Sequence, residues 1–115
     1  MKVIIAGGRD FTDKELLYTS LDAFHKGTPI TEIVCGGAKG ADSLGKSWAL
    51  SRNIKVTDMP ADWAQYGKSA GFIRNRQMGD YADYLIAFWN SVSPGTKHMI
   101  EYMKSIGKHG IVIYY

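Results

Sequence analysis

Short runs of consecutive apolar residues recur along the chain, separated by longer stretches of mixed polarity. The runs cover Val3 to Ala6, Ile33 to Cys35, Leu85 to Trp89 and Ile111 to Tyr115, with a weaker one at Ile54 to Val56. Uninterrupted apolarity over so few residues is typical of β-strands that are buried on both faces. The pattern therefore predicts a strand at each run.

The stretches between these runs carry helix signals. Thr12 and Glu15 have the spacing of a capping box, which predicts the start of a helix that ends at Gly27. Further helices are expected over Ala41 to Arg52, Ser69 to Tyr81 and Thr96 to Ile106.

Strands that alternate with helices require right-handed crossovers and a parallel sheet covered on both faces. We therefore expect residues 1–115 to form one domain, a Rossmann-like three-layer α/β sandwich with a mostly parallel five-stranded sheet. In such sheets, ligands bind beyond the carboxyl ends of the strands.

Composition supports a folded domain and narrows its chemistry. The 115 residues are 45% hydrophobic and 22% charged, which excludes a disordered chain. The net charge of +3 is spread without a basic run, so nucleic-acid binding is possible but not favoured. Cys35 is the only cysteine, and no Cys/His spacing matches a metal site. The apolar start is too short for a signal peptide or membrane span, so we expect a cytoplasmic protein without membrane contact.

Three loops that leave the same expected sheet edge are rich in small residues. They are Gly7-Gly8-Arg9-Asp10, the segment from Gly36 to Asp42, and the segment from Asn90 to Thr96. Tight turns often need glycine for conformational reasons alone, but glycine before a helix start also forms anion sites from backbone amides. Three such loops together favour a phosphate site, which we expect at Gly36 to Asp42 because that loop also carries Lys39.

Two familiar nucleotide motifs fail in context. The segment from Gly40 to Ser47 matches the P-loop expression GxxxxGK[ST], but four residues separate it from Cys35 and it overlaps an expected helix. The dinucleotide fingerprint GxGxxG is absent from all three loops. Neither a P-loop NTPase nor a standard NAD or FAD enzyme is expected, and we predict no cofactor and no metal.

The long segment before the fourth strand adds cationic and aromatic candidates. Arg74 and Arg76 lie on nearly opposite faces of their helix, so only one can face a pocket; we expect Arg74, with Asn75, to reach a phosphate or ribose. Trp63 and Tyr66 can stack on a base, although aromatic residues in small domains more often fill the core.

Together with Pro60 to Trp63, Ala70-Gly71 and Ser93 to Thr96, these segments resemble the sequence motifs of a known protein family. The chain is similar to the YspA-like, stand-alone branch of the SMF/DprA-LOG (SLOG) superfamily of Rossmann-like domains, found in bacteria and phages. The resemblance spans nearly the whole chain, and it implies a nucleotide or nucleotide-derived, phosphoribose-containing ligand. LOG relatives cleave the base from a nucleoside monophosphate, and DprA relatives bind single-stranded DNA.

The resemblance departs from LOG enzymes at one decisive position. Their loop PGGxGTxxE ends in a catalytic glutamate, whereas Met99 stands at that place here, and Glu101 lies about 200° further around the helix. Methionine cannot accept a proton. We therefore expect a binder or sensor; the alternatives are an enzyme that uses Asp10 or Asp42, and a DprA-like DNA-binding module.

The candidate ligand-binding residues follow from these loops and from the arginine helix: Gly7, Gly8, Arg9, Asp10, Gly36, Gly37, Lys39, Gly40, Asp42, Arg74, Asn75, Gly95 and Thr96. The apolar final strand, Ile111 to Tyr115, leaves surface that a monomer would expose. A homodimer or higher homo-oligomer is therefore also expected.

Overall fold

All five strands form one parallel sheet, in the order β3-β2-β1-β4-β5. The computed structural model describes residues 1–115, and the expected Rossmann-like α/β architecture is confirmed. The strands are β1 (Lys2–Gly7), β2 (Glu32–Cys35), β3 (Lys55–Asp58), β4 (Tyr84–Trp89) and β5 (His109–Tyr114). The helices are α1 (Lys14–Gly27), α2 (Ala41–Ser51), α3 (Trp63–Tyr66), the 3-10 turn η1 (Gly67–Ser69), α4 (Ala70–Tyr81) and α5 (Pro94–Ser105).

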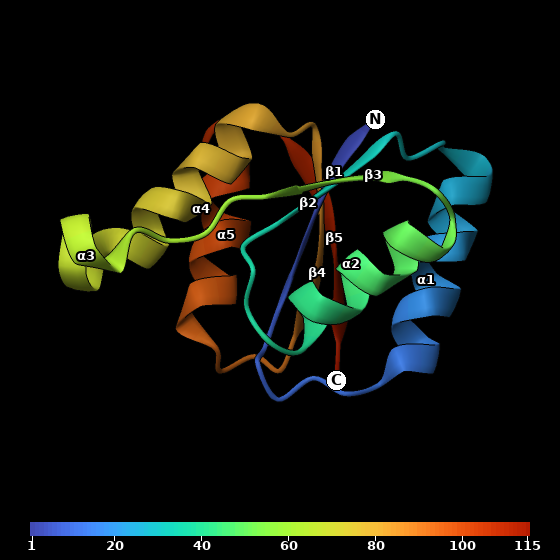
Figure 1. Cartoon of the computed structure of the whole chain (residues 1–115), viewed down its shortest axis with the longest axis horizontal. Helices are drawn as coiled ribbons and strands as arrows, with labels where there is room; N and C mark the ends of the chain where they lie inside the picture. Colours follow the sequence, from blue (N-terminus) through green and yellow to red (C-terminus); the bar gives the residue numbers. More distant parts are fainter.

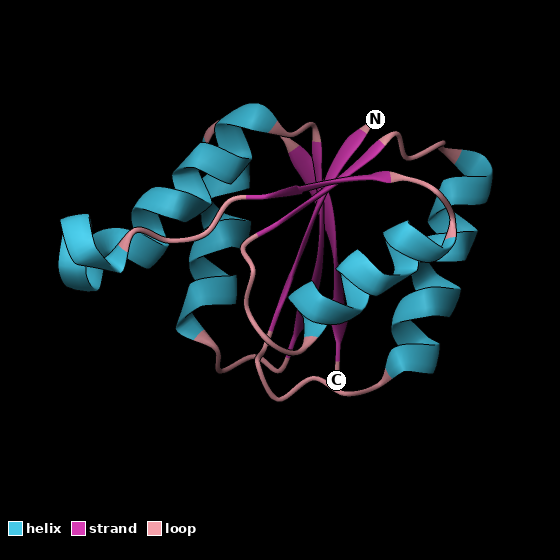
Figure 2. Ribbon diagram, in the orientation of Figure 1, coloured by secondary structure: helices cyan, strands magenta, loops and turns pink.

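Helices cover both faces of the sheet and create two apolar cores (Figure 1). Val3 and Ile5 of β1 pack in the core beneath α1 and α2, whereas Ile4 packs in the core beneath α4 and α5. Figure 2 shows the sheet between these two pairs of helices. Because β1 is buried on both sides, its sequence is continuously apolar rather than alternating.

Two helix starts differ from the sequence-based expectation. The prediction of a capping box at Thr12 is wrong. The side chain of Asp13 caps α1 instead, because it accepts a hydrogen bond from the Leu16 N–H at 3.0 Å. Helix α5 begins at Pro94, two residues before the predicted start, since proline needs no amide partner in the first turn.

The segment between β3 and α4 forms an arm that projects from the body of the molecule (Figure 1). Its short helix α3 packs mainly against η1 and α4. Trp63 and Tyr66 on α3 are exposed, so they do not fill the core. None of the helices is long and apolar enough to span a bilayer.

The strand order places a crevice beside the end of β1. The chain leaves β1 toward α1 on one face of the sheet, and leaves β4 toward α5 on the other face (Figure 1). Adjacent parallel strands whose connections diverge in this way leave an opening at their carboxyl ends. The candidate functional site lies at this opening.

Candidate functional site

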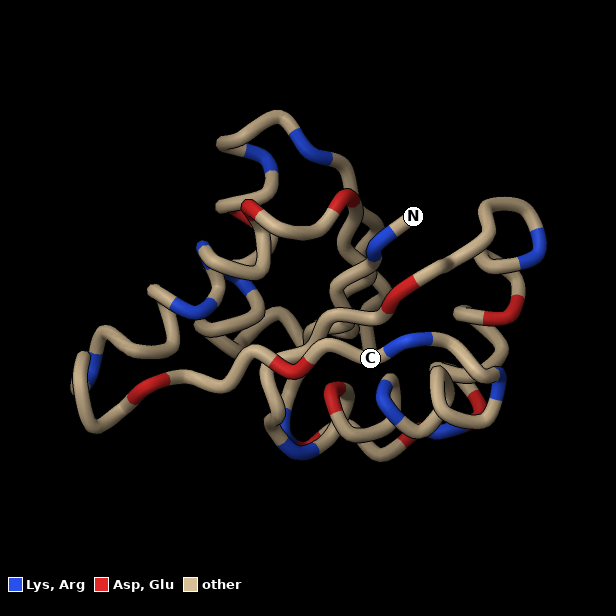
Figure 3. The backbone as a smooth tube through the Cα atoms, turned by 45° about the horizontal axis from the view of Figure 1, so that its top comes forward, with Lys and Arg blue, Asp and Glu red and all other residues tan.

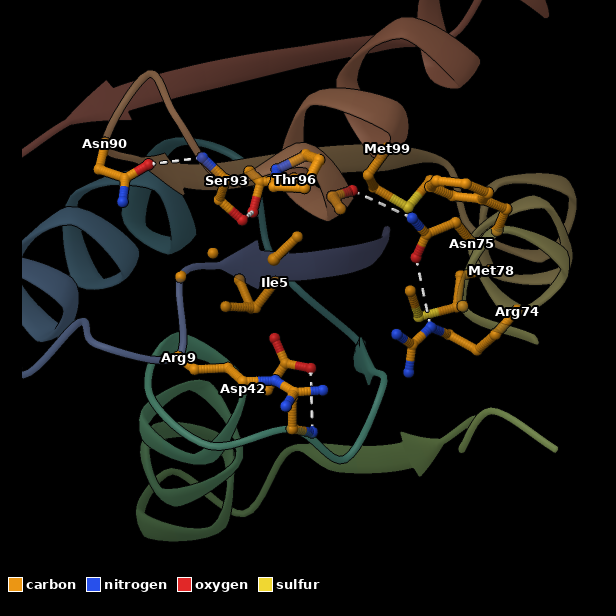
Figure 4. Close-up of a pocket in the computed structure, with 18 of the residues that line it drawn as sticks. Ile5, Arg9, Asp42, Arg74, Asn75, Met78, Asn90, Ser93, Thr96 and Met99 are labelled. Atoms are coloured by element: carbon orange, nitrogen blue, oxygen red, sulfur yellow. Dashed lines mark hydrogen bonds between the residues drawn. The ribbon is translucent and has the colours of Figure 1, made fainter. Parts of the chain in front are cut away.

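A cavity of about 560 Å³ opens at the carboxyl ends of β1 and β4. Its size falls in the range of about 300 to 1,000 Å³ that is usual for ligand pockets. The walls come from the end of β1, the start of α2, the arm, α4 and the loop that leads into α5 (Figure 4).

Most of the predicted ligand-binding residues meet at this cavity. Its wall includes Gly7, Gly8, Arg9, Asp10, Asp42, Arg74, Asn75, Gly95 and Thr96. Four predicted residues lie outside the wall: Gly36, Gly37, Lys39 and Gly40. The topology thus brings together residues that are far apart in the sequence, and ligand binding by them stays a prediction.

The Gly36–Asp42 loop is organised around an internal carboxylate. Asp42 Oδ2 accepts hydrogen bonds from the Gly36 N–H at 3.1 Å and the Ala38 N–H at 3.3 Å. A side chain at Gly36 would displace the Arg74 guanidinium that packs against it, and Gly40 lies against the backbone of Gly8. Two amides of the loop therefore already have an anionic partner, and the expected phosphate site there stays a prediction.

Asp42 is the most perturbed carboxyl group of the cavity. The residue is only 7% exposed, and burial raises its pKa from 3.8 to about 6. Its loop hydrogen bonds and the charges of Arg74 and Arg9 act in the opposite direction and lower the pKa. Its second oxygen, Oδ1, makes no hydrogen bond within the protein and points toward the cavity (Figure 4).

Arg74 is half-buried and reaches across from α4 to the neighbouring loop. Its Nη1 donates to the Gly36 carbonyl oxygen at 2.8 Å, and its Nε donates to Asn75 Oδ1 at 3.2 Å. Arg76 is exposed and does not line the cavity. The two side chains therefore point in different directions, as the helical spacing predicts.

Asn75 is buried and fixes α4 against α5. Its amide nitrogen donates to the Gly95 carbonyl oxygen at 3.1 Å and lies 3.2 Å from His98 Nδ1. With the amide oriented in this way, His98 Nδ1 accepts the hydrogen bond and its ring is neutral. Burial, the largest cause, lowers the pKa of His98, and the Arg76 charge adds to this effect.

The N-terminus of α5 faces the cavity with free hydrogen-bond donors. The amides of Gly95 and Thr96 have no acceptor within the protein, and no acidic residue lies in the first turn. The preceding loop is held in place because Asn90 Oδ1 accepts from the Val92 and Ser93 N–H groups. This is a fixed set of donors at the positive end of a helix dipole.

The loop after β1 is braced by the end of the chain. The Tyr115 hydroxyl donates to Asp10 Oδ1 at 2.7 Å, and burial with this contact raises the pKa of Tyr115 to about 12. Any side chain at Gly8 would collide with the Tyr115 hydroxyl. Gly8 therefore permits a close approach that fixes one wall of the cavity.

Trp63, one of the two aromatic residues considered for stacking from the sequence, lies at the rim of the cavity with Phe72; they are 55% and 44% exposed. Phe72, Lys68, Asn90 and Ser93 also line the cavity but were not predicted as ligand contacts. The only sequence signal for Asn90 and Ser93 was their position in a loop rich in small residues.

Met99 lies on the cavity wall, where its side chain is buried. The position at which LOG enzymes carry their glutamate thus faces the cavity but holds an apolar group. Asp10 and Asp42 are the carboxylates on this wall. No group of three or more His, Cys, Asp or Glu side chains is placed to hold a metal ion.

The P-loop match is not a phosphate loop in the structure. Gly45, Lys46 and Ser47 lie inside α2 rather than at its start. Lys46 points to Asp58, with which it forms a salt bridge of 2.9 Å. The lysine side chain therefore links α2 to the end of β3.

Comparison with known proteins identifies the family. A family model described as "YspA, cpYpsA-related SLOG family" matches residues 1–66, which is more than half of the chain. The chain belongs to this SLOG family. Gene 61 protein of Mycobacterium phage D29 is 33% identical over 113 residues, covering 92% of this chain and 90% of that protein.

Solved structures of DNA processing protein A (DprA) share the fold. The DprA of Streptococcus pneumoniae has a TM-score of 0.76 at 19% identity, and the match covers 96% of this chain. The DprA of Helicobacter pylori, described for its single-stranded DNA binding mode, has a TM-score of 0.70 at 21% identity over 97% of this chain. The SLOG chain spans 49% and 64% of these two proteins, respectively.

Proposed function

We propose that this SLOG protein binds a nucleotide or nucleotide-derived ligand, with a phosphate group at the N-terminus of α5. The observation that carries the proposal is the pair of unpartnered amides at Gly95 and Thr96, at a helix start that faces the cavity. In the competing loop before α2, the Gly36 and Ala38 amides are bonded to Asp42, whose charge would also repel a phosphate. The donors at α5 have no such competitor.

The remaining walls suit the other parts of a nucleotide. Trp63 and Phe72 offer exposed ring faces at the rim, and stacking on such rings is a common way to hold a base. Arg9 and Arg74 supply positive charge to the cavity, and Arg9 makes no ion pair within the chain. A phosphoribose-containing ligand would match these groups from phosphate to base.

The proposed role is that of a binder or sensor rather than of a LOG-like hydrolase. Met99 occupies the cavity wall where the LOG reaction needs a carboxylate, and methionine offers no proton acceptor. An enzyme that uses Asp42 is the alternative. Burial raises the pKa of Asp42 to about 6, which is a suitable range for a general acid or base near neutral pH.

Calorimetric titration with ribonucleoside 5′-mono-, di- and triphosphates tests the proposal. Gly95→Asp places a carboxylate at the first turn of α5, where a side chain meets no atom within 4 Å. The helix dipole should favour this variant's fold, while the added charge should weaken nucleotide binding at least about tenfold. Gly95→Asn serves as the uncharged control. Equal affinity in the aspartate and asparagine variants, or no nucleotide binding by the wild type, would contradict the proposal.

A second candidate function is binding of single-stranded DNA. The specific observation is the projecting arm, on which Trp63 and Tyr66 are exposed, together with exposed Phe72 in the first turn of α4. Lys68 lies on the same segment. Figure 3 shows Lys and Arg spread along the fold and interspersed with Asp and Glu, rather than gathered in one basic strip. A continuous basic groove is the usual partner of stacking aromatics, so this function ranks second.

We also propose a homodimer or larger homo-oligomer, built on the open edge of β5. This edge strand contains no charged Lys, Arg, Asp or Glu residue and no proline, which are the usual protections against edge pairing. Ile111 is 39% and Tyr114 is 63% exposed on it. A cytoplasmic location stays a prediction.

A further inference from the structure

Among the buried residues that line the cavity, Asp42 keeps an acceptor oxygen that the fold leaves unused. Asp42 is buried, and both of its hydrogen bonds from the loop amides go to the same oxygen, Oδ2. Oδ1 points toward the cavity, as Figure 4 shows, and accepts no hydrogen bond from the chain. No buried side-chain oxygen or nitrogen of the chain lacks a partner, so Oδ1 is open to the cavity, and a ligand that displaces water from it must supply a donor in return.

The fold holds this oxygen in one orientation. The two loop amides fix the carboxylate plane through Oδ2, and Asp42 itself lies in the first turn of α2. Neither Arg9 nor Arg74 forms a salt bridge with Asp42, although both line the same cavity. Oδ1 is therefore held in place and is free to accept a hydrogen bond from a ligand.

The place of Asp42 indicates which part of a nucleotide would supply the donor. The free amides of α5 and the aromatic rim on α3 and α4 lie on other walls of the cavity. A nucleotide that spans from these amides to the rim carries its sugar in the middle. We propose that Asp42 Oδ1 accepts a hydrogen bond from a ribose hydroxyl group of the ligand, and that it selects ribonucleotides over DNA.

The selection against DNA follows from the chemistry of the two sugars. Within a DNA strand, the 2′-hydroxyl is absent and the 3′-oxygen is esterified, so the sugar has no donor to offer. Asp42 would then remain unpaired and would face backbone phosphates of the same charge. A ribonucleotide has a free 2′-hydroxyl, which both pairs with the carboxylate and satisfies it.

This inference rests on the proposed nucleotide binding, and the test separates the two. Ribonucleoside 5′-monophosphates and their 2′,3′-dideoxy counterparts are titrated by calorimetry into the wild type, Asp42→Asn and Asp58→Asn. Asparagine at position 42 keeps an oxygen for the loop amides but loses the charge. Asp58 provides a matched substitution outside the lining of the main cavity.

The wild type and Asp58→Asn should prefer the ribonucleotide by about tenfold or more, the usual effect of a hydrogen bond to a charged group. In Asp42→Asn the preference should shrink to about threefold or less, because a neutral amide makes a weaker bond. Circular dichroism should show that each variant is folded.

Equal binding of ribo and dideoxy forms by the wild type would overturn the role of Asp42 while leaving nucleotide binding intact. A preference that survives in Asp42→Asn would also overturn it. Failure of every nucleotide to bind would overturn the proposed function, and this inference with it. A short oligothymidylate that binds the wild type more tightly than every ribonucleotide would contradict the selection against DNA.

Discussion

Replacing Asp42 by asparagine should change how the stability of the fold depends on pH. Burial raises the pKa of the folded-state carboxyl from 3.8 to about 6. Between these values the folded protein holds a proton that the unfolded chain has lost. The contribution of Asp42 to stability is therefore fully present below pH 3.8 and is lost as the pH rises through about 6.

The magnitude follows from the size of the shift. One pKa unit corresponds to about 1.4 kcal/mol, so a rise of about two units costs the ionised protein about 3 kcal/mol. Asparagine retains an oxygen that can accept from the Gly36 and Ala38 amides, but it carries no charge. The unfolding free energy of Asp42→Asn minus that of the wild type should therefore increase by about 2 kcal/mol from pH 4 to pH 7, because part of the full difference is already present at pH 4.

Urea unfolding, followed by circular dichroism over this pH range, measures the difference. Asp58→Asn gives a control of opposite sign, because the Lys46 hydrogen bond lowers the pKa of Asp58. Asp58 stabilises the fold above its unfolded pKa, and this contribution is lost as the pH falls. A constant difference between Asp42→Asn and the wild type across the range would refute the reasoning.

The remaining predictions concern binding, the fold and assembly. Arg74→Lys should lose about 1 to 3 kcal/mol of nucleotide affinity, because lysine lacks the planar guanidinium that makes paired hydrogen bonds. Arg76→Lys should bind almost as tightly as the wild type. Equal losses in the two variants, measured by calorimetry, would contradict the assignment of Arg74 as the arginine that contacts the ligand. Lys108→Met removes an ammonium group that donates to the carbonyls of Gly79, Asp80 and Ala82 at the end of α4. Urea unfolding should show a loss of about 1 to 3 kcal/mol, and exposed Lys104→Met should change little. Sedimentation velocity should show a dimer or larger species for the wild type and mainly monomer for Ile111→Lys; a wild type near 12.8 kDa would contradict the assembly.

The strands could be predicted from the sequence because a strand that is buried on both faces has an uninterrupted run of apolar residues. The apolar runs at Val3 to Ala6 and Leu85 to Trp89 fall inside β1 and β4, which occupy the middle of the sheet. Helix ends were less predictable, because competing caps lie side by side. Thr12 and Asp13 both suit an N-cap, and only the path of the loop decides for Asp13.

The site was predictable as a meeting of loops, but not in its internal contacts. Parallel strands bring their carboxyl ends to one edge, which explains why Gly7, Asp42 and Thr96 share a cavity. The expectation of phosphate at the Gly36–Asp42 loop did not include the turn of Asp42 back onto the loop amides. The exposure of Trp63 also depends on the projecting arm. The arm could not be predicted because its sequence has no periodic pattern of apolar residues.

The central claim is that the cavity holds a nucleotide with its phosphate at α5. A crystal structure of the protein grown with the ribonucleotide that binds most tightly tests it most directly. We predict phosphate oxygens within hydrogen-bond distance of the Gly95 and Thr96 amides, with the sugar beside Asp42. Phosphate bound at the Gly36–Asp42 loop, or a nucleotide bound outside the cavity, would contradict the claim.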